Sequence, residues 1–497
     1  MPIKPPSIDD LARVARALRL DLSASDLESF RQLLQPLVLA YARLDQLEEP
    51  APVVKYPRDD GWRPAPEQNP LNGWYWRCEI RGAADGLLKG KTFAIKDNVA
   101  VAGIPMMNGT ALLEGFVADI DATVVSRILD AGGTILGKSV CESLCSSGGS
   151  HTSDNGPVRN PHDRSRSTGG SSSGSGALVA SGVVDMAIGG DQGGSIRIPS
   201  SWCGIYGLKP TYGLVPYTGA FPIELTLDHL GPMGRSAADC ALMLEAIAGP
   251  DGLDPRQRPD LVGQPYSKLL TGEVRGLRLA IVREGFGIPG SSQKDVDDCV
   301  IAAAKSFEKL GARVNEVSIP WHRDGGAVWI AIGCEGAPTT MYNWKGYYPV
   351  AMLDALAHGI AERPGGVSET AKMLSMLGQY MREQYHGRYY AKARNLARSL
   401  TAAYNAALND ADLLVMPTTP MKATLLPLPG CSREEYIERA TNMGANTGQF
   451  DVTGHPAMNV PCGMSEGLPV GMMLVGRIGD DATVLRAADA WQRNFGR

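Results

Sequence analysis

The segment from Thr168 to Pro210 constrains the fold more than any other part of the chain. It begins with a run made almost entirely of glycine and serine, TGGSSSGSG, and continues directly into the apolar stretch GALVASGVVDMAIGG. Such a run elsewhere is typical of a flexible linker, but the apolar residues that follow indicate a buried helix and strand. The small residues are therefore predicted to lie inside the fold, where glycine permits close backbone approach and unusual torsion angles.

Short apolar runs alternate with helical patterns from Lys91 onward. Examples are the apolar run KTFAIKDNVA, the helical pattern DATVVSRILDAGG and the apolar run TILGKSV, followed near the C-terminal end by the runs DLLVMPTTP and VGMMLVG. This alternation predicts an α/β fold with a mostly parallel or mixed central sheet that is covered by helices on both faces. The segment around 320–400 is richer in helix formers, tyrosine and methionine, which predicts a helix-rich insertion that shapes a pocket.

The N-terminal segment is predicted to form two amphipathic helices. The apolar stripes that indicate them consist of Ile8, Leu11, Val14 and Leu18, and of Leu27, Phe30, Leu34, Leu37, Tyr41 and Leu44. Ser25 and Glu28 have the spacing of a capping box for the second helix. Two such helices cannot bury both stripes alone, so they are expected to pack on the main body or on a second subunit. The proline-rich stretch 49–70 predicts a linker, giving an N-terminal extension of residues 1–70 and a catalytic body of residues 71–497.

Composition argues against several classes of function. The 48 Lys and Arg against 53 Asp and Glu give a net charge of -5, so nucleic acid is not an expected partner. The nine cysteines are scattered and odd in number, which favours a reducing compartment over a disulfide framework. The N-terminal sequence lacks an apolar signal core, and no apolar stretch is long enough to span a membrane. The chain is therefore expected to be cytoplasmic, with no membrane partner.

The glycines around Ser195 suggest acyl-transfer chemistry. Free backbone N–H groups in such a run can point at the oxyanion of a tetrahedral intermediate. A serine nucleophile also needs a base, and the usual base is histidine; the chain has seven histidines, but none lies in a nucleophile-elbow context. A neutral, buried lysine can replace histidine. Lys96 ends the apolar run 92–95, where a strand can deliver it into a site or leave it on the surface.

The pattern of these segments resembles the amidase signature, whose usual form is GGSSGG, then D-x-GGSIR-x-P, then G-x-KP. The matching segments here are 169–172, 191–199 and 207–210, and Ser195 follows Ser171 by 24 positions. The segments KTFAIKDNV, TLDHLGPMGRS and 450–476 resemble further blocks of the same family. The chain resembles this family over about residues 85–480, and Ser173 stands where the family has a glycine.

The resemblance implies a serine hydrolase with a mixed sheet, and it implies a role for each matching residue. Ser195 is the expected nucleophile and forms an acyl-enzyme. Ser171, whose peptide bond is cis in the family, is expected to relay protons between Ser195 and Lys96, the expected base. The backbone amides of Gln192, Gly193, Gly194 and Ser195 are the expected oxyanion hole. No cofactor or metal is implied.

Within the family, the chain resembles bacterial broad-specificity and enantioselective amidases that have an N-terminal helical extension. That subgroup hydrolyses aliphatic and aromatic carboxamides, and its N-terminal helices help to form a homodimer, so a small-molecule amide substrate and a homodimer are expected. An aryl carbamate, anilide or hydrazide hydrolase stays open, as does the glutamine-hydrolysing A subunit of an aminoacyl-tRNA amidotransferase. The candidate pocket residues are Cys145, Ser146, Leu227, Trp329 and Phe450.

Two other motifs have alternative interpretations. Residues 132–139 match the phosphate-binding pattern G-x4-GK[ST], but the helical pattern precedes this segment and the strand-like run falls inside it, which is the reverse of the required order. Cys141, Cys145 and His151 suggest a metal site, yet no second cysteine pair completes a tetrahedral set. We therefore expect neither nucleotide nor metal at these positions, and interpret the two thiols as buried or lining the active site.

Overall fold

A single mixed sheet runs through residues 54–497, the larger of the two units into which the chain divides. The computed structural model describes residues 3–49, 51–342 and 350–496. The strands are β1 (Trp74–Arg81), β2 (Thr92–Lys96), β3 (Thr134–Ser139), β4 (Met186–Asp191), β5 (Tyr206–Lys209), β6 (His229–Gly234), β7 (Arg278–Val282), β8 (Arg313–Val317), β9 (Leu413–Pro417), β10 (Ala457–Ser465) and β11 (Leu468–Val475). Their order in the sheet is β1-β3-β2-β4-β6-β5-β10-β11-β9-β7-β8.

The sheet combines two parallel regions with an antiparallel centre. Strand β2 pairs in parallel with both β3 and β4, and β7 pairs in parallel with both β8 and β9. Between these regions, β6, β5, β10 and β11 pair with their neighbours in antiparallel fashion. The expected α/β fold with a mixed sheet is confirmed.

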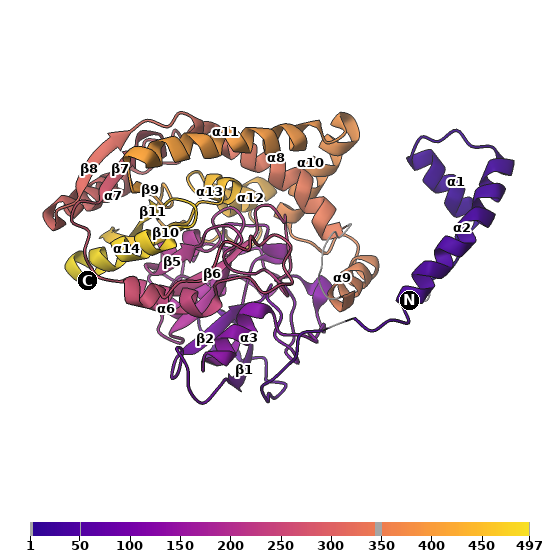
Figure 1. Cartoon of the computed structure of the whole chain (residues 1–497), viewed down its shortest axis with the longest axis horizontal. Helices are drawn as coiled ribbons and strands as arrows, with labels where there is room; N and C mark the ends of the chain where they lie inside the picture. The colour runs from indigo at the N-terminus through magenta and orange to yellow at the C-terminus, as the bar shows by residue number, and fades with distance from the viewer. Residues whose placement is uncertain (1–2, 50, 343–349, 497) are drawn as a thin grey trace. The chain divides into compact units, whose positions relative to one another are not determined.

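Helices cover both faces of this sheet (Figure 1). Those that precede β9 and lie outside the helical insertion are α3 (Thr123–Asp130), α4 (Ser173–Ala180), α5 (Arg197–Cys203), α6 (Ala237–Ile247) and α7 (Lys294–Ser306). Those that follow β9 are α12 (Arg433–Thr441), α13 (Gly448–Thr453) and α14 (Asp481–Phe495). No helix among the described residues is long and apolar enough to cross a bilayer.

The alternation of side chains along β2 divides the interior into two cores. Phe93 and Ile95 belong to the largest core cluster, together with residues of α3, α6 and α14, whereas Ala94 packs with residues of α4 in a different cluster. Because successive side chains of a strand point to opposite faces, Lys96 shares the face of Ala94. The strand therefore directs its terminal lysine toward the side of the sheet that α4 covers.

The described residues between β8 and β9 form four helices, in the segment expected to be a helix-rich insertion. They are α8 (Trp321–Tyr342), α9 (Val350–Glu362), α10 (Glu369–Tyr385) and α11 (Arg388–Asp410). Both α10 and α11 pack against α8 (Figure 1). Helix α8 also contacts α13, so the insertion reaches the C-terminal part of the chain.

Residues 1–53 form the second unit and contain α1 (Ile8–Ala17) and α2 (Ala24–Leu44). The capping box expected from Ser25 and Glu28 is wrong. Ser23 and Asp26 form it instead: Asp26 N–H donates to Ser23 Oγ at 3.2 Å, and Ser23 N–H donates to Asp26 Oδ2 at 2.8 Å. Both pairs have the required spacing, and the helix begins one residue after Ser23.

The boundary between the units lies earlier than the sequence pattern predicts. Residues 54–70 have the composition of a free linker, but they belong to the larger unit. Arg58 forms an ion pair with Asp121 at 2.7 Å, and Trp62 forms a β-bridge with Arg77. Proline-rich sequence has extended backbone in either setting, so these distant partners were not evident from the sequence.

Candidate active site

Lys96 and Ser171 meet in the interior of the larger unit. Lys96 Nζ donates to Ser171 Oγ at 2.8 Å and to the Gly190 carbonyl at 3.2 Å, and both the lysine and the serine are completely buried. The Gly170–Ser171 peptide bond is cis. A Cβ atom at Gly170 would lie 2.4 Å from the Gly149 carbonyl oxygen, so only glycine fits before Ser171. The strand-end lysine is therefore inside the fold and not on its surface.

Ser195 lies in the turn between β4 and α5, beside the Ser171 segment. The Ser172 N–H donates to the Ser195 carbonyl at 3.3 Å, which joins the two segments. In the described part of the chain, we find no hydrogen bond between the hydroxyls of Ser171 and Ser195. Ser195 is buried, with 7% of its surface exposed.

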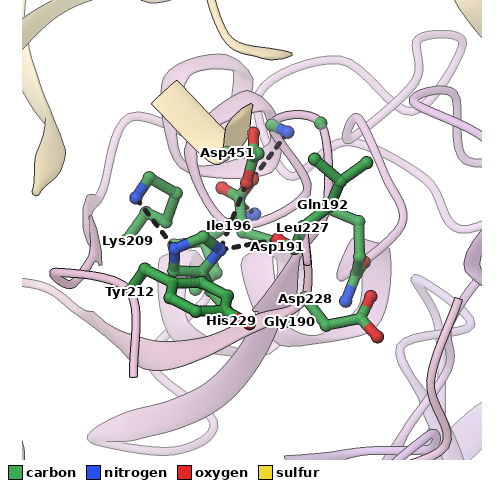
Figure 2. Close-up of polar contacts among 12 residues, drawn as sticks. Gly190, Asp191, Gln192, Ile196, Lys209, Tyr212, Leu227, Asp228, His229 and Asp451 are labelled. Carbon is green, nitrogen blue, oxygen red and sulfur yellow. Dashed lines mark hydrogen bonds and ion pairs between the residues drawn. The ribbon is translucent and has the colours of Figure 1, made fainter. Parts of the chain in front are cut away.

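A buried network of charged and polar side chains contacts this turn, and Figure 2 shows part of it around Asp191, His229 and Asp451. Asp191 accepts hydrogen bonds from the N–H groups of Gly194 at 2.6 Å and Ile196 at 3.0 Å. Arg197 pairs with Asp191 at 2.9 Å and with Asp451 at 2.7 Å. Burial acts to raise the pKa of the Asp191 carboxyl, but Arg197 outweighs this effect and holds that pKa below its usual range. Asp191 and Arg197 thus form a completely buried ion pair next to the turn that holds Ser195.

The same network includes two basic residues that the sequence did not identify. His229 lies between Lys209 and Asp451, with its Nε2 3.3 Å from Lys209 Nζ and its Nδ1 3.5 Å from Asp451 Oδ1 (Figure 2). Burial, reinforced by the charge of Lys209, holds the pKa of His229 well below its ordinary value. Burial also lowers the pKa of Lys209 to about 8. Lys209 belongs to the closing G-x-KP motif, which is the one signal that pointed toward this position.

The contacts of the histidines do not support a histidine as the base for Ser195. Both ring nitrogens of His229 are engaged, because Nδ1 also lies 2.7 Å from the Leu227 carbonyl. His151 contacts the Tyr436 carbonyl, and His322 contacts Tyr404. Among the described residues, no histidine ring is in hydrogen-bond contact with Ser195.

The backbone N–H groups expected to form the oxyanion hole belong to the consecutive residues 192–195, in the turn between β4 and α5. The Gly194 N–H is already used by Asp191, which narrows the expected oxyanion donors to Gln192, Gly193 and Ser195. A Cβ atom at Gly193 would lie 2.6 Å from the ring of Trp329. Glycine at this position therefore leaves room for the indole.

Ser173, the departure from the family pattern, contacts a buried carboxylate beside Ser171. Its hydroxyl donates to Glu142 Oε1 at 2.7 Å, and Thr152 donates to Glu142 Oε2 through both its N–H and its hydroxyl, each at 2.7 Å. Burial raises the pKa of Glu142 to about 7, although the donors oppose that rise. The Glu142 N–H in turn donates to the Ser171 carbonyl at 3.2 Å. Ser173 therefore binds Glu142, whose backbone in turn contacts the segment that contains the cis peptide bond.

The candidate pocket residues divide into two groups. Cys145 and Trp329 lie at the site: Trp329 Nε1 donates to the Gln192 carbonyl at 2.7 Å, and Lys96 contributes to a pKa of about 6 at Cys145. Burial acts to raise that Cys145 pKa, while hydrogen bonding with Cys141 and the charge of Lys96 lower it. Leu227 and Phe450 instead belong to one core cluster, and the Ser146 hydroxyl donates to the Ser143 carbonyl at 2.8 Å.

The two motifs with alternative interpretations have structural roles. Residues 134–139 form β3 and follow α3, so the order is the reverse of a phosphate-binding loop. Lys138 forms a completely buried ion pair with Asp97 at 2.9 Å. The thiols of Cys141 and Cys145 each lie 3.5 Å from Asn108 Oδ1.

Comparisons with known proteins extend over most of the chain. A family model described as Amidase matches residues 76–485. An enantioselective amidase of Rhodococcus rhodochrous is 47% identical over 500 residues, covering 98% of this chain and 95% of that protein. The A subunit of the glutamyl-tRNA(Gln) amidotransferase of Methanosarcina acetivorans is 35% identical over 417 residues, covering 82% and 85%. The solved structure of a peptide amidase from Stenotrophomonas maltophilia aligns with a TM-score of 0.68 and 28% identity, covering 82% and 83%.

Proposed function

The chain belongs to the amidase family and is a hydrolase of that family, and from this premise we propose that it cleaves carboxamides through an acyl-enzyme on Ser195. The products are a carboxylic acid and ammonia or an amine. The observation that carries the proposal is the buried 2.8 Å hydrogen bond between Lys96 Nζ and Ser171 Oγ, beside the turn that holds Ser195. The 47% identical relative, named an enantioselective amidase, supports a carboxamide as substrate.

The proposed reaction begins with attack by Ser195 Oγ on the carbonyl carbon. Ser171 takes the proton from Ser195 and passes its own proton to Lys96, which acts as the base in its uncharged form. The tetrahedral oxyanion receives hydrogen bonds from the N–H groups of Gln192, Gly193 and Ser195. The proton returns through Ser171 to the leaving amine, and an ester on Ser195 remains. Water then attacks this ester by the same relay, and the acid is released.

Hydrolysis of a substrate panel by the purified protein tests this proposal. Acetamide, benzamide, an anilide, an aryl carbamate, a hydrazide and glutamine are compared by the release of acid and amine. Carboxamides are expected to react fastest, and Ser195→Ala and Lys96→Met are each expected to lose at least about 100-fold in kcat. Hydroxylamine is expected to intercept the acyl group as a hydroxamate in the wild type. Retention of hydrolysis by Ser195→Ala would overturn the mechanism.

The panel also separates the alternative substrates. A preference for the aryl carbamate, anilide or hydrazide would identify a hydrolase of that type, because these substrates pass through the same tetrahedral chemistry. The 35% identical relative belongs to an amidotransferase, so glutamine is included. Turnover of simple amides without any partner chain favours the free amidase.

We also propose that the chain forms a homodimer through α1 and α2. We further propose that it is located in the cytoplasm. Apolar side chains on both helices are not covered within their own unit; they include Val14, Leu18, Leu33, Leu37 and Leu44. All nine cysteines lie in the described residues and are free thiols, which favours a reducing compartment. Sedimentation analysis of the full chain and of Leu33→Glu with Leu37→Glu tests the dimer: the wild type is expected at twice 52.9 kDa and the variant at 52.9 kDa.

A further inference from the structure

Two side chains hold the carbonyl groups of consecutive peptides in the turn before Ser195. The indole N–H of Trp329, on α8 of the helical insertion, donates to the Gln192 carbonyl at 2.7 Å. The hydroxyl of Thr447, just before α13, donates to the Gly193 carbonyl at 2.5 Å and lies 3.2 Å from the Gly444 carbonyl. Helices α8 and α13 pack against each other, so both donors come from one structural block.

Fixing a carbonyl also fixes the N–H of the next residue. In a planar trans peptide the C=O and N–H bonds point in opposite directions, and the peptide bonds on both sides of Gly193 are trans. The bond from Trp329 therefore directs the Gly193 N–H away from the indole. The bond from Thr447 directs the Gly194 N–H away from the threonine, and that N–H reaches Asp191 at 2.6 Å.

We infer that Trp329 and Thr447 are positioning residues: Trp329 orients the Gly193 N–H as an oxyanion donor, and Thr447 fixes the next peptide, whose N–H binds Asp191, so that the turn keeps Gly193 in this orientation. This inference rests on the proposed function, because it assigns the Gly193 N–H to the oxyanion. Donors that are already aimed at the developing charge need no reorganisation during the reaction, and this preorganisation is the main source of their catalytic effect. Thr447 is completely buried and the Trp329 ring packs against Gly193, so neither bond competes freely with water.

The steric contacts explain why the turn needs glycine next to these donors. A Cβ atom at Gly194 would lie 2.5 Å from Thr447 Oγ1, and one at Gly448 would lie 2.9 Å from Trp329 Cγ. The indole is thus enclosed between Gly193 and Gly448. A side chain at either glycine would move the ring and break its bond to Gln192.

Matched substitutions test the inference with kcat, KM and the affinity for a boronic acid inhibitor. Thr447→Val removes the hydroxyl with little change of shape, whereas Thr447→Ser retains it; Trp329→Phe keeps an aromatic ring but loses the N–H. Removing a direct oxyanion donor costs about 100- to 1,000-fold in kcat, and loss of an orienting bond is expected to cost about 10- to 100-fold. Thr447→Ser is expected to recover kcat to within about threefold of the wild type.

The boronic acid distinguishes orientation of the donors from a general loss of structure. Its tetrahedral adduct with Ser195 places an oxygen in the oxyanion position, so its affinity is expected to fall in parallel with kcat in Thr447→Val and Trp329→Phe. KM and the affinity for the product carboxylate are expected to change by less than about threefold, since these reflect ground-state binding. Unchanged kcat in both variants, or an equal loss in product affinity, would overturn the inference.

The wild type and Ser195→Ala separate this inference from the proposed function. If the wild type does not bind the boronic acid and Ser195→Ala still hydrolyses amides, the proposed function fails. If Ser195→Ala is inactive and the wild type binds the boronic acid, but Thr447→Val and Trp329→Phe both behave as the wild type does, only the positioning role fails.

Discussion

Replacing Ser173 with alanine tests whether its hydroxyl stabilises the buried Glu142 carboxylate. The hydroxyl donates to Glu142 Oε1 at 2.7 Å, and both residues are completely buried. A buried hydrogen bond to a charged group contributes about 1.5–3 kcal/mol to stability, and one to a neutral group about 1 kcal/mol. Ser173→Ala is therefore expected to lower the free energy of unfolding by about 2 kcal/mol when Glu142 is ionised, and by about 1 kcal/mol or less when it is neutral.

The pH dependence of this loss follows from the pKa of Glu142. That pKa rises from 4.5 to about 7 in the folded chain because of burial. A raised carboxyl pKa means that the folded state binds the proton more tightly, so stability is greatest below pH 4.5 and falls by about 3 kcal/mol as the pH rises to 7. Ser173→Ala raises the Glu142 pKa further. The loss of stability in this variant is therefore expected to be larger at about pH 9 than at about pH 6.

Urea unfolding followed by tryptophan fluorescence measures both values. Ser175→Ala is a matched control, because Ser175 is equally buried in α4 and donates to the neutral Ile188 carbonyl at 3.0 Å. Its loss of stability is expected to be the same at both pH values. In a double-mutant cycle, Ser173→Ala is expected to cost at least about 1 kcal/mol less in the Glu142→Gln background. The reasoning is refuted if the cost of Ser173→Ala depends on neither the pH nor Glu142.

Two further predictions concern the Lys138–Asp97 ion pair and the Cys145 thiol. Lys138→Met leaves the buried Asp97 carboxylate without its charged partner and is expected to cost about 3–5 kcal/mol in urea unfolding. The double variant with Asp97→Asn is expected to recover most of this loss. Equal stability of the single and double variants would contradict the ion-pair argument. Iodoacetamide at pH 7 is expected to inactivate the wild type by alkylating Cys145, since the pKa of that thiol is about 6; Cys145→Ser is expected to resist inactivation, and an equal rate of inactivation in this variant would exclude Cys145 as the target.

The sequence predicted those parts of the fold that depend on local patterns. Apolar runs indicated β2, β3, β4, β9 and β11, and the alternation of side chains along β2 is enough to direct Lys96 to the face of Ala94. The order of the strands was not predictable, because β4 pairs with β6 and β5 with β10 across long intervals of sequence. The capping box was predicted two residues late because two serines, Ser23 and Ser25, each have an acidic residue three positions later. Local spacing alone does not distinguish them.

The residues that hold the catalytic segments in place could not be predicted from the sequence, for a related reason. Lys96, Ser171 and Ser195 were found through a family pattern, and the pattern also contains Asp191 and Lys209. The partners that hold these residues come from elsewhere: Glu142 is 31 positions from Ser173, and Thr447 is 254 from Gly193. Neither partner has an unusual sequence environment. Only the packing of the insertion and the C-terminal segment brings them to the site.

The glycines of the signature acquire a second explanation from the structure. From the sequence, they indicated close approach of backbone to substrate and free N–H groups for an oxyanion. The contacts at Gly193 and Gly194 add a steric reason within the protein itself, because Trp329 and Thr447 occupy the volume that a Cβ would need. The two explanations make different predictions. If glycine at position 193 serves only the substrate, adding Trp329→Ala to Gly193→Ala does not raise the free energy of unfolding. If it makes room for the indole, Trp329→Ala recovers part of the stability that Gly193→Ala loses.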